Sequence, residues 1–301
     1  MFIHMVCAFL FLKGRWIVGE RKYKINKILN NNVILAIDIE KKQEIVLVGK
    51  GIGFSKKINE FITLSDKEIE KSFLNFDEST KKEYINLINE IDDRIIIICE
   101  KIIKKAEEKL GKLNNHIHIA LTDHISFAIE RAKSGMGLNN PFLYEIQALY
   151  PKEFEIGLIA IDLIKSELGV DLKEVEAGFI ALHIHSARQN KNVGDTIKNT
   201  KLLLDLIKII ETELNIEIGT NELTYTRLIN HLRTSLNRME ENKNIKNPLL
   251  NIIKEQFAKS YQIANKIGEH IAKVKSVEVS EDELGYLALH IERIKEVKNF
   301  N

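Results

Sequence analysis

Cysteine is nearly absent from this chain, and proline and long apolar runs are scarce. The two cysteines, Cys7 and Cys99, are too few for a disulfide framework and have no metal-site spacing. This usage is typical of a reducing compartment, so we expect a cytoplasmic protein. The apolar run over residues 2 to 12 is about eleven residues long, whereas a membrane-spanning helix needs about twenty. We therefore expect no stable membrane insertion.

The apolar run also lacks the order of a secretion signal. Its positive charges follow it instead of preceding it, and no small-residue cleavage site is evident. Residues 1 to 22 are therefore interpreted as an N-terminal extension without a function of its own, and the first domain is expected to begin at Tyr23.

The three prolines, Pro141, Pro151 and Pro248, all lie beyond residue 140. No proline therefore interrupts the region after residue 84, where isoleucines recur every three or four positions. This period predicts one long amphipathic helix. Its apolar positions are Ile85, Ile88, Ile91, Ile95, Ile98 and Ile102. Residues 65 to 82 are polar and charged, which indicates a linker or a first helical turn before it.

A net charge of only +1 conceals an asymmetry along the chain. Residues 1 to 22 carry +3, residues 23 to 64 carry another +3, and the remainder sums to about −5. Only the N-terminal part suits a polyanionic partner. With 301 residues, of which 45% are hydrophobic, the chain is expected to form two or three domains.

Residues 24 to 57 have the pattern of a small antiparallel sheet. Two β-branched runs, residues 33 to 37 and 45 to 48, are bounded by turn residues, and strict alternation over the first strand would place Ile25, Lys27 and Leu29 on one side. Three consecutive asparagines at 30 to 32 predict the first turn, because asparagine tolerates positive φ and bonds its own backbone.

The turns of this sheet offer the groups that unpaired RNA needs. Cations suit phosphates, an exposed ring suits a splayed base, and amides suit base edges. The candidates are the amides of Asn30, Asn31 and Asn32, the cations Lys27, Lys50, Lys56 and Lys57, and the ring of Phe54. Composition alone also fits a glycine-rich hairpin with a solvated lysine face. No strand-loop-helix unit follows the glycines, so the run does not predict nucleotide binding.

The rest of the chain is an internal repeat with a constant offset of 107 residues. Residues 123 to 131 return at 230 to 238, Asn140-Pro141 returns as Asn247-Pro248, and residues 176 to 184 return at 283 to 291. A constant offset over three matches predicts two tandem copies of one all-α helical-bundle domain.

Each copy retains two histidines, His124 and His183 in the first and His231 and His290 in the second. A helical histidine is usually a structural residue, but retention at four matched places favours chemistry. A neutral imidazole is a nucleophile that can accept a phosphoryl group. Metal binding is the alternative use; since no cysteine or acidic cluster completes a ligand set around any histidine, we expect no metal.

The N-terminal motifs resemble the RNA-binding domain of BglG-type transcriptional antiterminators. They are Lys27-Ile-Leu-Asn-Asn-Asn-Val and Gly49-Lys-Gly-Ile-Gly-Phe54. The resemblance implies a dimeric four-stranded sheet that grips an RNA hairpin. It implies that Lys27, Asn32, Gly49, Lys50 and Phe54 touch RNA and that the two other asparagines shape the turn. Lys50 stands where many relatives have arginine, so it can contact a phosphate but not clamp a base through two bonds.

The repeat resembles paired phosphotransferase-system regulation domains, through Leu121-Thr-Asp-His124, Asn140-Pro-Phe-Leu-Tyr-Glu and Gly178-Phe-Ile-Ala-Leu-His183. The implied boundaries are 23 to 78 for the RNA-binding domain, 79 to 192 for the first regulation domain and 193 to 301 for the second.

The resemblance implies a sugar-responsive antiterminator, not an enzyme, with no cofactor. It binds a hairpin in the leader of a sugar-utilisation operon as a homodimer. The sugar-specific permease would phosphorylate mainly the first regulation domain, and the general phosphocarrier protein the second. Two alternatives stay open: a DNA-binding activator with the same regulatory domains, which would need a helix-turn-helix, and a phosphocarrier protein.

Overall fold

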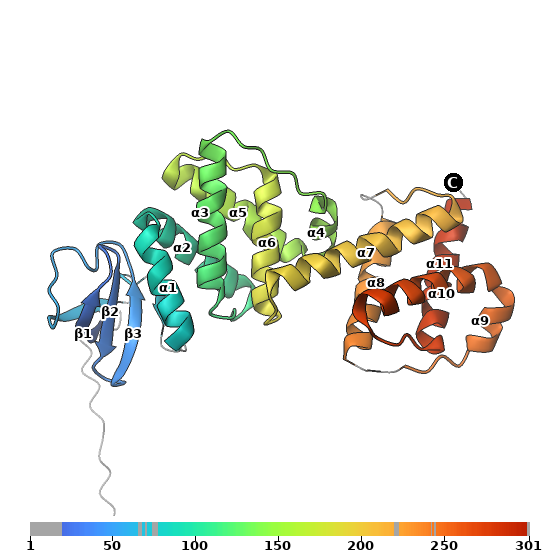
Figure 1. The fold of residues 1–301 in the computed structure, drawn as a ribbon, viewed down its shortest axis with the longest axis horizontal. Helices are drawn as coiled ribbons and strands as arrows, with labels where there is room; N and C mark the ends of the chain where they lie inside the picture. The colour runs from blue at the N-terminus through green and yellow to red at the C-terminus, as the bar shows by residue number, and fades with distance from the viewer. Residues whose placement is uncertain are drawn as a thin grey trace, which may run out of the picture. The chain divides into compact units, whose positions relative to one another are not determined.

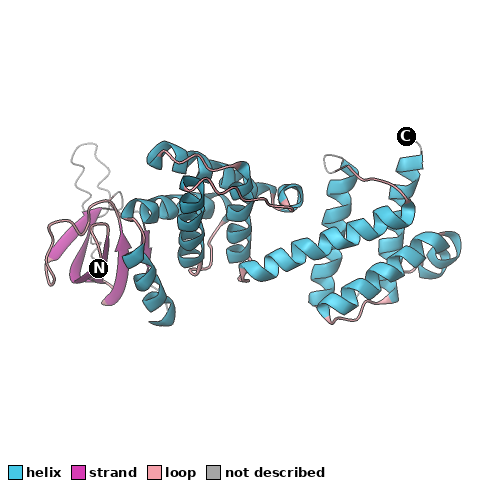
Figure 2. Ribbon diagram, turned by 45° about the horizontal axis from the view of Figure 1, so that its top comes forward, coloured by secondary structure: helices cyan, strands magenta, loops and turns pink. Residues whose placement is uncertain are grey.

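The computed structural model describes residues 20–65, 68–69, 71–73, 78–219, 223–241, 243 and 245–299. Most of the N-terminal extension, residues 1 to 19, lies outside the described residues. The chain divides into two compact units, Met1–Lys104 and Lys105–Asn301. The described strands all belong to the first unit, and the second unit is helical (Figure 1, Figure 2).

The first unit is built on a five-stranded antiparallel sheet with the order β4-β1-β2-β3-β5. Its strands are β1 Glu20–Ile28, β2 Val33–Asp38, β3 Gln43–Val48, β4 Phe61–Ser65 and β5 Lys71–Phe73. The expected antiparallel sheet is confirmed. It begins three residues before Tyr23, because residues 20 to 22 pair with β4. The three-residue β5, which pairs with β3, falls in the segment expected to be a linker.

The alternation expected along β1 is wrong at one point. A β-bulge shifts the register between Ile25 and Lys27, which pair with Ala36 and Leu35 on β2. The extra residue exchanges the two faces beyond it. Ile28 consequently packs on the same core as Ile25, and Lys27 is exposed. That core is Tyr23, Ile25, Ile34, Ala36, Ile45, Leu47, Ile52, Ile62 and Leu64.

Two helices replace the single long helix expected after residue 84. They are α1 Glu78–Glu90 and α2 Asp93–Leu110. The break comes at Asp92, whose side-chain Oδ1 accepts a hydrogen bond from the backbone N–H of Arg94 at 2.9 Å and whose carbonyl accepts one from Ile95. Asp92 therefore caps a new helix, as a carboxylate at a helix start does. Isoleucines keep the same spacing on both sides of the break, so their periodicity could not predict where the first helix ends.

The remaining helices are α3 Ile117–Lys133, α4 Leu143–Leu149, α5 Pro151–Leu168, α6 Glu174–Arg188, α7 Val193–Leu214, α8 Leu223–Glu240, α9 Leu250–Gln256, α10 Ala258–Lys275 and α11 Glu281–Asn299. Both ends of α4 and α5 are displaced by 107 residues from those of α9 and α10, and α6 and α11 start at the same displacement. The tandem helical copies predicted from the sequence are confirmed, and α2 and α7 lead into them.

The two copies share one continuous apolar core in the second unit. Polar contacts tie α8 to α4: the Tyr225 hydroxyl donates to Glu145 Oε1 at 2.9 Å, and Arg233 donates to the Leu149 carbonyl at 2.7 Å. Among the described helices, none combines the length and the apolar character that crossing a bilayer requires.

Candidate functional sites

The asparagine turn and the glycine loop meet at one end of the sheet. The turn joins β1 to β2, and the loop follows β3. Gly49 N donates to the Asn32 carbonyl and Gly53 N to the Asn31 carbonyl, both at 2.9 Å, while Gly51 N donates to Asn32 Oδ1 at 2.5 Å. A Cβ on Gly53 would lie 2.4 Å from the Asn30 carbonyl oxygen. The glycines therefore allow the two segments to approach this closely.

The structure divides the seven residues that the resemblance assigns to the RNA surface or its turn into two groups. Lys27, Asn31, Lys50 and Phe54 are exposed, and the Phe54 side chain is 65% accessible. Asn30, Asn32 and Gly49 are engaged inside the turn or buried. The exposed group combines two cations, one amide and one ring face at the same end of the sheet. These are the groups that bind phosphates and unstacked bases.

Asn32 has a second partner, which the sequence did not suggest. Its Nδ2 donates to Asp93 Oδ2, the first residue of α2, at 3.1 Å. Burial raises the pKa of Asp93, although the hydrogen bond from Asn32 opposes this. The amide of Asn32 is therefore shared between the glycine loop and α2.

In the first repeat the structure brings His124 of α3 and His183 of α6 together. Their ring centroids are 4.9 Å apart. His124 Nε2 lies 3.1 Å from Glu176 Oε2, and Arg131 donates to the other oxygen of Glu176 at 2.9 Å. Burial, with a smaller contribution from His124, lowers the pKa of His183 to about 3. His183 is therefore neutral at pH 7.

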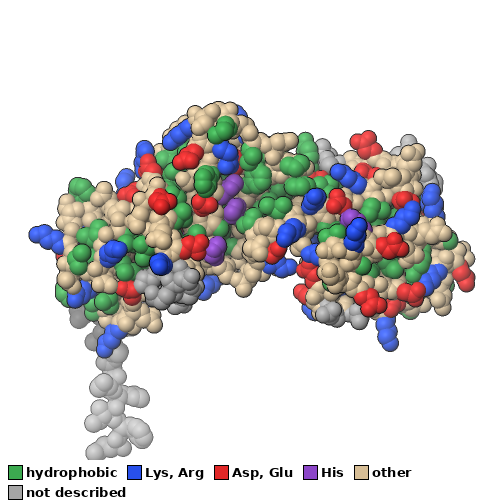
Figure 3. All heavy atoms as spheres, viewed as in Figure 1, with side chains coloured by type: hydrophobic (Ala, Val, Ile, Leu, Met, Phe, Trp, Pro, Cys, Tyr) green, Lys and Arg blue, Asp and Glu red, His purple; other side chains and the backbone are tan. Residues whose placement is uncertain are grey.

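In the second repeat His231 of α8 stacks on His290 of α11, with ring centroids 3.7 Å apart. Arg238 binds both oxygens of Glu283 at 2.8 Å. Burial and neighbouring charges lower the pKa of His231, and that of His290 to about 4. Histidine side chains are visible over both repeats in Figure 3, beside basic side chains over the second.

Each histidine pair thus has an arginine and a glutamate beside it that we did not single out from the sequence. Arg131 and Glu176 correspond to Arg238 and Glu283 at the same offset of 107. Because all four lie at the ends of the matched segments, the repeat itself carried the signal that could have found them.

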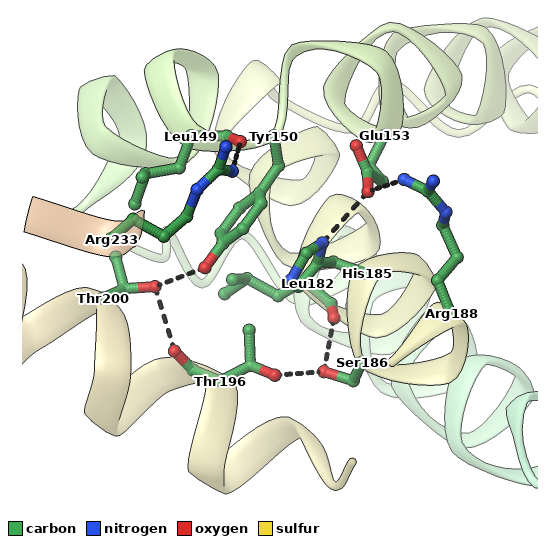
Figure 4. Close-up of polar contacts among 10 residues, drawn as sticks. All are labelled: Leu149, Tyr150, Glu153, Leu182, His185, Ser186, Arg188, Thr196, Thr200 and Arg233. Carbon is green, nitrogen blue, oxygen red and sulfur yellow. Dashed lines mark hydrogen bonds and ion pairs between the residues drawn. The ribbon is translucent and has the colours of Figure 1, made fainter. Parts of the chain in front are cut away.

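A third histidine of the first repeat, His185, has a different partner. His185 Nδ1 lies 3.0 Å from Glu153 Oε1, and Arg188 binds the same oxygen (Figure 4). Within the part of the chain that the structure describes, no group of three or more histidine, cysteine, aspartate or glutamate side chains could hold a metal ion.

Comparison with known proteins places these features in one family. The CAT RNA binding domain model matches residues 23–82, and the PRD domain model matches twice, at 100–187 and 204–294. The chain belongs to the BglG-type antiterminator family. Its order of domains, RNA-binding sheet first and PRD copies after it, agrees with the order expected from the sequence motifs.

Several relatives of this BglG-type chain cover nearly its whole length. It is 35% identical to Transcription antiterminator LicT of Bacillus subtilis (strain 168), over 90% of this chain and 98% of that protein. It is 35% identical to the Beta-glucoside operon antiterminator of Dickeya chrysanthemi, over 90% and 96%. A crystal structure of GlcT CAT-PRDI matches with a TM-score of 0.52 and 44% identity, covering 56% of this chain and 99% of that one.

Proposed function

We propose that this chain is a sugar-responsive antiterminator that binds a partly paired hairpin in nascent mRNA and so prevents a terminator from forming. The observation that carries the proposal is the exposed group of Lys27, Asn31, Lys50 and Phe54, held at one end of the sheet by the asparagine turn and the glycine loop. The asparagines at 30 and 32 and Gly49 act by fixing this surface. The protein works in the cytoplasm, where the transcript is made.

Binding is by a homodimer in this proposal. The segment leading into the edge strand β4 exposes Ile58 and Phe61, which are 57% and 67% accessible. Exposed apolar side chains that lie close together are typical of a surface that another chain covers. A second copy of the sheet would cover them and double the number of RNA contacts.

The four paired histidines are the control inputs. Three of them have a lowered pKa, so their rings are neutral at pH 7 and can attack a phosphoryl donor. The sugar permease would modify His124 and His183, and the general phosphocarrier would modify His231 and His290. Each phosphoryl group adds nearly two negative charges. A change of about 2.7 kcal/mol in the free-energy difference between the active and inactive dimer would change their ratio a hundredfold.

The test of RNA binding is a gel-shift titration of the full chain against a bulged RNA hairpin from the leader of a sugar operon. The matching DNA duplex is the control. We expect salt-sensitive binding to the RNA alone, and loss of affinity in the Phe54→Ala variant. Equal affinity for the DNA duplex would contradict the proposal.

The test of control is an antitermination reporter in cells. His124→Ala or His183→Ala should make its output independent of inducer, because the inhibitory phosphoryl group can no longer be attached. If both variants still respond to inducer, the first repeat does not carry the inhibitory signal.

A further inference from the structure

A small pocket opens beside the stacked histidines of the second repeat. Its volume is about 70 Å³. One wall is Thr224, Arg227, Leu228 and His231 of α8, and the other is His290, Arg293, Ile294 and Val297 of α11. About 10–15 Å³ of such space holds one water, so the pocket has room for the four heavy atoms of a phosphoryl group.

The two arginines of this pocket are unusual in being unpaired. Arg227 and Arg293 are exposed, and neither has a polar partner among the described residues. Arg238, by contrast, has its guanidinium bound to Glu283. A guanidinium without a carboxylate partner keeps its donors for a ligand, and its planar fork matches phosphate oxygens.

Helix geometry aims both arginines at the histidines. Arg227 precedes His231 by four positions on α8, and Arg293 follows His290 by three on α11. Residues at these spacings lie on the same face of a helix. As a positive charge near the two rings, Arg293 also contributes to the lowered pKa of both histidines, after burial.

The first repeat does not keep the two arginines of this pocket. The positions that match Arg227 and Arg293 are Ala120 and Ser186, and the Ser186 hydroxyl is buried and donates to the Leu182 carbonyl at 2.7 Å. His124 lies beside the Glu176 carboxylate instead. Each repeat keeps one arginine–glutamate pair beside its histidines, but only the second repeat adds two further arginines at these positions.

We propose that Arg227 and Arg293 form an oxyanion pocket that binds the phosphoryl group as it is transferred to His231 or His290. This inference rests on the proposed role of the histidines as phosphoryl acceptors. In the transfer, a neutral ring nitrogen forms the new N–P bond while the donor's bond to phosphorus breaks, and the donor's leaving atom takes the electron pair. The phosphorylated ring releases its N–H proton to water, which balances any proton that the leaving atom takes up. Charge on the phosphoryl oxygens is stabilised by the two arginines.

The test uses the full-length chain and phosphoramidate, a small donor that needs no protein recognition. The rate of phosphorylation at each histidine is measured by mass spectrometry of alkaline digests. In the Arg227→Gln/Arg293→Gln double variant we expect the rate at His231 and His290 to fall about tenfold, with His124 and His183 unchanged. The double lysine variant should recover part of the rate, because it keeps the charge.

Arg94→Gln is the matched control, since Arg94 is also exposed but pairs with Asp92. It should leave all rates unchanged, and thermal unfolding should confirm that every variant folds. An unchanged rate at the second pair in the double glutamine variant, or an equal fall at both pairs, would overturn the pocket while leaving the histidines as acceptors. A wild-type chain that accepts no phosphoryl group at any of the four histidines would overturn both proposals.

Discussion

At the residue scale, three identical side chains at the end of β1 have three different sets of contacts. Asn30 Oδ1 accepts from the backbone of Asn32 at 2.9 Å, which closes the turn. Asn32 bonds Gly51 and Asp93, and Asn31 is exposed. Turn chemistry predicted the turn itself, since asparagine bonds its own backbone. It could not assign the roles, because the partners of Asn32 come from segments about 20 and 60 residues away.

Lys50 is expected to bind RNA through a phosphate alone. Lys50→Gln should weaken RNA binding several-fold and reduce the slope of log affinity against log salt by about 0.7–0.9, the release of one counterion. The measurement is a titration at several salt concentrations. Lys41→Gln is the control: this exposed lysine lies in the β2–β3 turn, at the opposite end of six-residue strands. An equal change in both slopes would show that Lys50 acts only through net charge.

Gly53 and Gly51 allow a matched test of the loop contact. Gly53→Ala should abolish RNA binding and destabilise the sheet by about 2 kcal/mol or more, because its Cβ would collide with the Asn30 carbonyl. Gly51 has φ +71° and open space around its Cβ position. Gly51→Ala should therefore cost only about 1–2 kcal/mol of backbone strain. Gel shifts and denaturant titrations compare the two, and equal losses of RNA affinity would contradict the argument.

Some of the residues beside the histidine pairs could have been predicted from the sequence, and others could not. Arg131 and Glu176 recur in the second repeat, so their identity across copies was a usable signal. Arg227 and Arg293 differ between the copies, and a repeat search discards such positions. Spacing along one helix places Arg227 near His231 and Arg293 near His290. That both arginines line one pocket depends on the packing of α8 against α11, which this spacing does not provide.

At the scale of elements, corresponding helices of the two repeats are joined by different polar contacts. In the first, Glu153 of α5 binds His185 and Arg188 of α6 (Figure 4). In the second, the corresponding interface pairs Ser260 of α10 with Glu292 of α11 at 2.6 Å. The acidic residue has moved to the other helix. Apolar period predicted these helices in both copies, but it does not report which side of an interface carries the charge.

Glu153 should give the second unit a measurable acid sensitivity. Burial would raise its pKa, but hydrogen bonds from His185 and Arg188 outweigh burial and lower it to about 2. Because the folded pKa lies below the ordinary value of 4.5, this carboxylate stabilises the fold above pH 4.5, and its contribution is lost as pH falls toward about 2. Glu153→Gln should cost about 1–3 kcal/mol at pH 7 and flatten the pH dependence of unfolding in that window.

The control for this variant lies two residues further along α5. Glu155 pairs with Lys109, but its side chain is 61% exposed. Exposed ion pairs contribute little, so Glu155→Gln should change the unfolding free energy by less than about 1 kcal/mol. If the two variants had the same unfolding free energy at every pH, the burial of Glu153 would have no energetic consequence.

At the scale of the whole molecule, α2 contributes residues to both compact units. It begins at Asp93, which bonds the asparagine turn, and its last residues belong to the unit that holds both histidine pairs. The sequence predicted the sheet, the repeats and their order. It did not predict that the first residue of a helix leading into the repeats would bond one of the candidate RNA residues.

Asp93 should restrain RNA binding in the free protein. Its carboxylate accepts the Asn32 amide, and it places a negative charge beside the surface meant for a polyanion. Asp93→Ala should therefore raise RNA affinity about three- to tenfold, or about 1 kcal/mol, and weaken the response to phosphorylation. Asp92→Asn is the matched control, because it removes the charge next to Asp93 and keeps a side-chain oxygen that can cap α2. An equal gain of RNA affinity in both variants would show that only the lost negative charge matters. A loss of RNA affinity in Asp93→Ala would show that the contact with Asn32 holds the RNA surface in its binding conformation.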